Sequence, residues 1–151
     1  LIEGYGLGLG FFDINEDGWT DIYVANDFLS TDIIYINNQD GTFTDKVHDY
    51  LDHSSRNSMG TDLADFNNDG NLDVIMVENM YASEVETPRN DAGTGLLMLG
   101  DGKGGFLPIT SKESGFFIRN DAKKLKMMNN KEGLILVANN NGLLQVIKIN
   151  D

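Results

Sequence analysis

Two nine-residue segments with the same pattern of acidic residues constrain this chain more than any other feature. Residues 13–21 read DINEDGWTD and residues 65–73 read DFNNDGNLD, so both follow D-x-N-x-D-G-x-x-D. Oxygen-bearing side chains at alternate positions, a glycine at the sharp turn and a closing Asp are typical of a loop around a hard divalent cation. Three carboxylates within about 4 Å repel by roughly 1 kcal/mol per pair in water, and a cation reverses this repulsion. We therefore predict that each segment binds one Ca²⁺ ion.

The residues around these loops distinguish them from EF-hands. An EF-hand needs a bidentate Glu at the twelfth position and a helix on each side. Val24 and Met76 occupy that position here. The segments 21–26 and 73–78, which follow the loops, are rich in β-branched and apolar residues, as strands are. Each loop is thus predicted to join two strands of a hairpin.

The rest of the chain also has the pattern of an all-β protein. It contains 17 glycines and two prolines, and short apolar segments alternate with turn signals. No segment has sustained helical periodicity. The predicted strands lie near 7–12, 20–25, 32–37 and 42–46, then near 59–65, 72–78, 95–100 and 105–110. Each set of four strands forms one antiparallel meander.

A third, incomplete unit follows, with strands near 125–128, 134–139 and 144–149. Its hairpin loop, 129–133, lacks the alternating aspartates and contains a Lys, so we predict no metal there. Three units at most cannot close the ring of about four to eight blades that a β-propeller needs. We expect one partial β-propeller over 1–151, whose other blades are missing from this chain. Its parts are blade 1 at about 7–46, a link at 47–57, blade 2 at about 58–110 with an insertion at 79–94, and a partial blade 3 at about 121–151.

Charge and composition exclude several classes of function. The chain has 24 acidic and 11 basic residues, a net charge of −13, which repels the phosphate backbone of nucleic acids. The basic cluster of Lys123, Lys124 and Lys126 is interpreted as a solvated strand or turn. There is no cysteine, so disulfides and zinc–thiolate sites are excluded. No stretch has the ~20 apolar residues of a membrane-spanning helix, so membrane insertion is not expected.

The loops, the strands around them and the blade-length repeat resemble FG-GAP and VCBS repeats, the bacterial relatives of the integrin α-chain propeller. More narrowly, residues 24–28, 35–44 and 58–60 resemble the ASPIC/UnbV, cartilage-acidic-protein-like branch. This resemblance implies a calcium-stabilised β-propeller, extracytoplasmic or exported, with a role in adhesion or in recognition of a protein or carbohydrate. It also implies the ligands, with Trp19 and Asn71 contributing main-chain carbonyls. The two sets are Asp13, Asn15, Asp17, Trp19 and Asp21, and Asp65, Asn67, Asp69, Asn71 and Asp73.

Recognition is predicted at the opposite edge of the blades from the calcium loops. That edge holds residues 26–30, the link with His48, Tyr50, His53 and Arg56, and the insertion with Tyr81 and Arg89. Loops on a rigid scaffold are the usual place for binding residues. The alternative is purely structural, with both histidines in a solvated link, Trp19 packed between blades, and Phe28, Phe43 and Phe106 in the core.

Two other classes of function remain as alternatives to a non-enzymatic binding module. Paired aspartates could serve as acid and base in a propeller that belongs to a polysaccharide-acting enzyme. Duplicated D-x-N-x-D-G loops also occur in dockerin-like docking repeats, which have a helix after each loop. Helices after residues 21 and 73 would favour the dockerin, and strands would favour the propeller.

Overall fold

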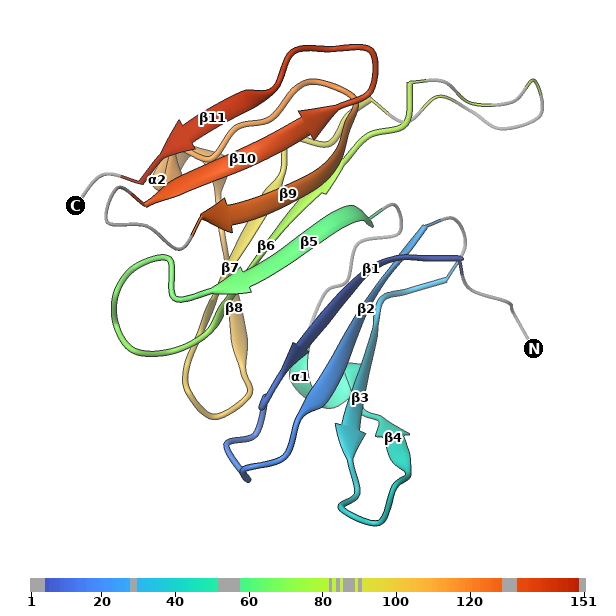
Figure 1. Ribbon diagram of the computed structural model, residues 1–151, viewed down its shortest axis with the longest axis vertical. Coiled ribbons are helices and arrows are strands. Elements are labelled where there is room, and N and C mark those ends of the chain that lie inside the picture. The colour runs from blue at the N-terminus through green and yellow to red at the C-terminus, as the bar shows by residue number, and fades with distance from the viewer. Residues whose placement is uncertain are drawn as a thin grey trace.

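The computed structural model describes residues 5–27, 30–51, 58–81, 83, 85, 89, 91–128 and 133–149. Their fold is a partial, open β-propeller of three antiparallel sheets (Figure 1). The first sheet contains β1 (Tyr5–Phe12), β2 (Asp21–Asp27), β3 (Ile33–Asn37) and β4 (Phe43–Asp45). The second contains β5 (Ser58–Ala64), β6 (Asp73–Glu78), β7 (Leu96–Gly100) and β8 (Phe106–Ile109). The third contains β9 (Ala122–Met128), β10 (Leu134–Asn139) and β11 (Gln145–Lys148). The predicted all-β fold class is confirmed.

Strands follow one another in the sheets as they do along the chain. The orders are β1-β2-β3-β4, β5-β6-β7-β8 and β11-β10-β9. Each acidic motif therefore connects the first two strands of its sheet, with Phe12 opposite Asp21 and Ala64 opposite Asp73. Strands, and not helices, follow both loops, as the propeller predicts and a dockerin does not.

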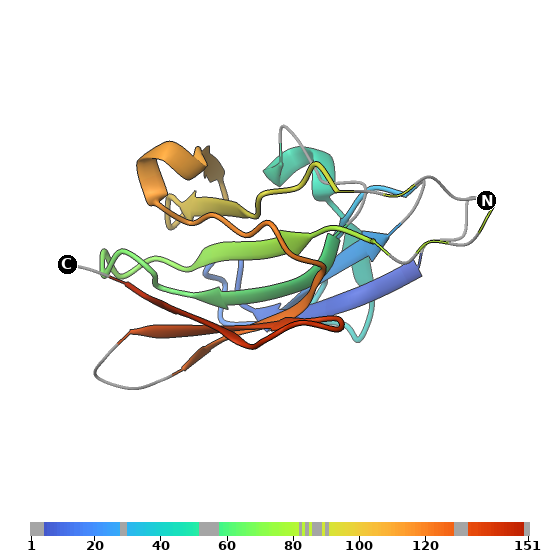
Figure 2. The ribbon, with the colours of Figure 1, turned by 90° about the horizontal axis from the view of Figure 1, so that it is seen from above.

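The three sheets follow one another in space in the order first, second, third (Figures 1 and 2). One hydrophobic core lies between the first and second sheets, and another lies between the second and third. The central strand β6 contributes to both, because its side chains alternate between the two faces of the second sheet. Val74 and Met76 pack in the core shared with the first sheet, and Ile75 and Val77 pack in the core shared with the third. Burial on both faces explains why β6 is a continuous apolar run, whereas strands with one solvated face alternate.

Glycine allows the second and third sheets to approach closely. A Cβ atom at Gly60 would lie 2.8 Å from both the carbonyl oxygen of Lys123 and the Cα of Lys124 on β9. Main-chain atoms cannot rotate away, so a larger residue would push the two sheets apart.

Two single-turn helices were not predicted. They are α1 (Val47–Tyr50), in the link after the first sheet, and α2 (Ser111–Ser114), after the second. Thr110 and Glu113 form a capping box at the start of α2, and Gly115 ends it with φ 70°. A four-residue helix is too short to have a hydrophobic period, but Thr-x-x-Glu followed by Gly is a readable signal.

Two aromatic residues lie outside the cores, contrary to expectation. Trp19 is 48% exposed in its loop, so it does not pack between blades, and Phe43 is 42% exposed at the start of the outermost strand of its sheet. Phe106 does pack against the first core, where its ring meets Phe12 edge-on at 6.5 Å between centroids. Phe28 lies outside the described residues.

Candidate metal sites and the opposite edge

The two acidic loops have the same backbone conformation. The fourth residue of each motif, Glu16 or Asn68, has a positive φ of 58° or 59°. The glycine two positions later, Gly18 or Gly70, has φ 88° or 91°. Only glycine adopts that conformation without strain, which explains its place in both motifs.

The first Asp of each motif holds the turn together. The carboxylate of Asp13 accepts hydrogen bonds from the backbone N–H of Asp17 at 3.0 Å and of Gly18 at 2.7 Å. Asp65 accepts the equivalent bonds from Asp69 at 3.1 Å and Gly70 at 3.0 Å. Both oxygens of this carboxylate thus face the interior of the loop.

The fifth residue of each motif, Asp17 or Asp69, faces the same interior. Asp17 accepts from the backbone N–H of Trp19 at 2.9 Å, and Asp69 accepts from that of Asn71 at 2.8 Å. These hydrogen bonds lower the pKa of both exposed carboxyls, so both are ionised at neutral pH. The amides of Asn15 and Asn67 donate to the same carboxylates.

The closing Asp of each motif is fully buried, and it joins its loop to the second and third strands of the sheet. Asp21 accepts from the backbone N–H of Ile14 and of Asn37, both at 2.8 Å. Asp73 accepts from Phe66 at 2.8 Å and from Gly100 at 2.9 Å. Asn37 ends β3 and Gly100 ends β7, so this carboxylate fastens the loop to the third strand of its sheet. Burial raises the pKa of Asp73 above its ordinary value. The sequence pattern predicts a ligand here but does not reveal this structural role.

The side-chain and main-chain oxygen atoms of each loop are the kind of ligand that a hard cation prefers. Each loop supplies only oxygen atoms, and a carboxylate oxygen that accepts one hydrogen bond keeps a second lone pair. Across the described residues, no three Asp, Glu, His or Cys side chains lie where they could together hold a metal ion. Instead, backbone N–H groups of the loop donate hydrogen bonds to the carboxylate oxygens. A bound cation would need the Asn side chains and the carbonyls of Trp19 and Asn71 as well.

At the opposite edge, a buried carboxyl joins the first two sheets. Asp32, which precedes β3, accepts hydrogen bonds from the Tyr23 hydroxyl at 2.7 Å and from the backbone N–H of Asn26 at 2.9 Å. The Ser58 hydroxyl of the second sheet donates to it at 3.3 Å. Burial, with a smaller contribution from the charge of Glu78, raises the pKa of Asp32 to about 6 despite these hydrogen bonds. Sequence reasoning missed this residue.

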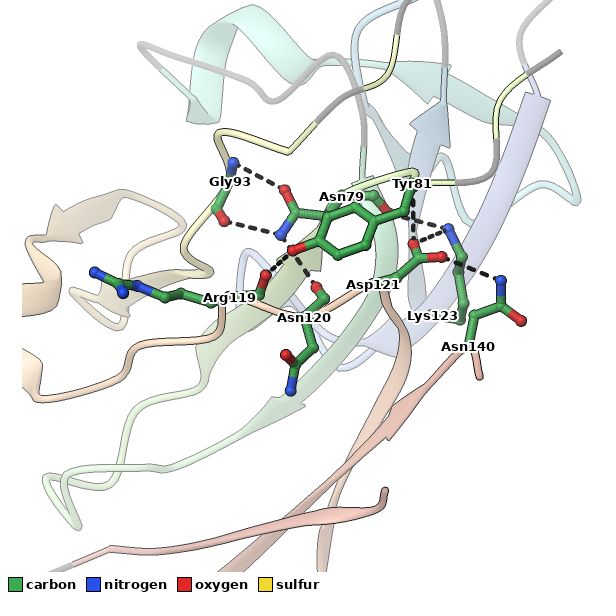
Figure 3. Close-up of polar contacts among 8 residues, drawn as sticks. All are labelled: Asn79, Tyr81, Gly93, Arg119, Asn120, Asp121, Lys123 and Asn140. Atoms are coloured by element: carbon green, nitrogen blue, oxygen red, sulfur yellow. Dashed lines mark hydrogen bonds and ion pairs between the residues drawn. The ribbon is translucent and has the colours of Figure 1, made fainter. Parts of the chain in front are cut away.

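A second polar cluster joins the second and third sheets (Figure 3). The buried side chain of Asn79 bonds both main-chain groups of Gly93 at 2.9 Å, which closes the neck of the insertion. The side-chain amide of Asn79 also donates to the main-chain carbonyl of Asn120 at 3.1 Å. The main-chain carbonyl of Asn79 accepts from the ammonium group of Lys123 at 3.0 Å. Lys123 also pairs with Asp121 at 2.7 Å, so it is part of a contact between sheets and not solely a solvated residue.

The aromatic residue predicted in the insertion lies in the same cluster. Tyr81 donates its hydroxyl to the carbonyl of Arg119 (Figure 3), and the guanidinium of Arg89 lies 4.2 Å from the centre of its ring. Tyr81, Asp121, Asn139 and Leu143 help to line an open depression of about 760 Å³ beside this cluster. His48 is exposed on α1, and His53 and Arg56 lie outside the described residues. Most of the third hairpin loop, 129–132, also lies outside them.

Comparison with known proteins identifies one part of the chain. Residues 13–76 match the FG-GAP-like repeat. The match begins at the first residue of the first acidic loop and ends in β6, just beyond the second loop. No curated protein and no solved structure matches the chain. Among the described residues, no helix has the length and apolar character to span a membrane.

Proposed function

We propose that this chain is a calcium-stabilised repeat module that acts by binding, and not by catalysis, in an exported or cell-surface protein. The observation that carries the proposal is the repetition of one loop conformation at residues 13–21 and 65–73. Both loops have the same signs of φ and the same pattern of carboxylate–backbone hydrogen bonds. The FG-GAP-like match over these loops agrees with a repeat module of this kind.

Calcium has a structural role in this proposal. The ion would bridge the exposed carboxylates of the loop to the buried closing Asp, which is already bonded to the third strand. With a dissociation constant near 10⁻⁴ M and millimolar calcium outside cells, each site would stabilise the fold by about 1.4 kcal/mol. Two sites would add about 3 kcal/mol, a large fraction of the stability of a small domain.

Adhesion, or recognition of a protein or carbohydrate, is proposed for the edge opposite the loops. The insertion, the open depression beside Tyr81 and the polar cluster of Figure 3 provide hydrogen-bonding groups there on a rigid support. An extracytoplasmic location fits this proposal, since calcium concentrations there suffice for weak structural sites.

Calorimetric titration with CaCl₂, combined with thermal melts in calcium and in chelator, tests the metal sites. Two binding events and a higher melting temperature in calcium are expected. Asp17→Ala and Asp69→Ala should each remove one event, while an exposed substitution outside the loops, Leu107→Ala, should remove none. A melt that is the same in chelator and in calcium would contradict the proposal.

A further inference from the structure

One face of the first sheet is apolar, and no described residue of another sheet covers it. Three alternate residues of β1 project from it, and Leu7, Leu9 and Phe11 are 45%, 60% and 64% exposed. The residues opposite them on β2 and β3 share this face and are also partly exposed. They are Ile22, Val24, Ile33 and Tyr35. We call these seven residues the open face.

The second sheet shows what covers such a face. In the same register, Leu63 pairs with Val74, which pairs with Met98, while Met76 pairs with Leu96. These five residues correspond to Phe11, Ile22, Tyr35, Val24 and Ile33 of the open face. In the second sheet they pack in the first core. The residues that cover them there include Tyr23, Ala25 and Ile34 from the other face of the first sheet.

The third sheet carries the matching covering face, and it is also open. Leu136, Ala138 and Val146 occupy the positions of Tyr23, Ala25 and Ile34, because Leu136 pairs with Val146 as Tyr23 pairs with Ile34. Ala138 is exposed and Val146 is 57% exposed. The open face therefore corresponds to the side that the second sheet contributes to its contact with the first sheet. The outer face of the third sheet corresponds to the side that the first sheet contributes.

Charge separates between the same two ends. Residues 5–45 contain eight acidic residues and no Lys or Arg. Residues 122–148 contain five lysines and one acidic residue, and two of these lysines, Lys123 and Lys126, already pair with Asp121 and Asp62 of the same chain. Association of unlike ends is favoured by this distribution, whereas two first sheets would repel each other.

We infer that the open face is an interface that receives the outer face of the third sheet of a second copy of this chain. Such a contact is heterologous, so two copies can satisfy both of their ends by closing a ring. Two copies would bring six sheets, within the about four to eight blades of a closed propeller. No predicted calcium ligand belongs to the open face, so the apolar contact does not need calcium. The charge difference does depend on it in part, because Asp13, Asp17 and Asp21 are predicted ligands and a bound ion would cancel two negative charges at that end.

Sedimentation equilibrium of the chain tests this inference, and the expected mass is twice the 16.7 kDa of one chain. Leu9→Lys at one end and Val146→Lys at the other should each weaken association about tenfold or more, since each places a charge in an apolar contact. Leu107→Lys is the matched control and should leave the mass unchanged. Leu107 is 66% exposed, but it belongs to the second sheet and lies neither on the open face nor on the outer face of the third sheet. Circular dichroism establishes that all three variants fold.

Mixing the two weakened variants identifies the geometry of the contact. One of the two junctions in a mixed pair joins unaltered faces, so the mixture should regain a dimer that neither variant forms alone. A monomeric parent chain would overturn the inference. So would a Val146→Lys variant that remains dimeric, because it would indicate a contact between two first sheets.

Discussion

The hydroxyl of Tyr23 donates to the buried carboxyl of Asp32 at 2.7 Å, within the junction between the first and second sheets. Ser58 reaches the same carboxyl from the second sheet. The junction thus contains an ionisable group that is sealed from water, and its protonation is coupled to folding.

The pKa of Asp32, about 6 against an ordinary 3.8, predicts that stability falls as pH rises. Between these values the folded chain retains a proton that the unfolded chain has lost, so the contribution is complete below about pH 4 and is lost by about pH 6. The difference corresponds to about 3 kcal/mol. Asp32→Asn should flatten this part of the curve, measured by urea unfolding from pH 4 to 7. A variant with the slope of the parent chain would contradict the assignment.

The closing Asp of a loop should contribute to stability even without calcium. Asp73→Ala leaves the N–H groups of Phe66 and Gly100 without their acceptor, which costs about 1–3 kcal/mol for each group that stays buried and unbonded. Asp69→Ala, in the same loop but exposed, should change the free energy of unfolding in chelator much less. Chemical denaturation of both variants in chelator makes the comparison. Equal losses would mean that the buried hydrogen bonds of Asp73 add no stability beyond those of the exposed Asp69.

Gly60→Ala should loosen the contact between the second and third sheets. The new Cβ would meet main-chain atoms of Lys123 and Lys124 at 2.8 Å, and overpacking of this kind costs about 1–3 kcal/mol. Gly6→Ala is the control, since its Cβ would meet only side-chain atoms, the nearest at 3.1 Å. Thermal unfolding should separate the two variants, and a Gly60→Ala protein as stable as Gly6→Ala would argue against the close approach.

Asn79→Ala should open the neck of the insertion. The variant loses both hydrogen bonds to Gly93 and the bond to Asn120, so the free energy of unfolding should fall by about 1–3 kcal/mol. Hydrogen exchange at the Gly93 amide should accelerate. Asn120→Ala, which keeps the main-chain carbonyl that accepts from Asn79, should preserve the protection of Gly93. Unchanged exchange in Asn79→Ala would mean that other contacts hold the neck.

Local patterns predicted the fold because each sheet is built from neighbours in sequence. The repeat at 13–21 and 65–73 fixed the hairpins, and alternation fixed the strands to within a few residues. What the patterns could not reveal depends on contacts between sheets. In the sequence Asp32 has the pattern of a turn residue, and only the fold shows its contacts with Tyr23 and Ser58. Trp19 has the composition of a core residue, but its loop leaves it exposed to solvent. The short helices α1 and α2 were missed because four residues carry no period.

The double-sided burial of β6 has an evolutionary consequence. The two junctions between neighbouring sheets use equivalent positions, so a gene could gain or lose one whole unit with little redesign of the others. Duplication of a stretch like residues 58–121 would therefore lengthen the stack in a single step.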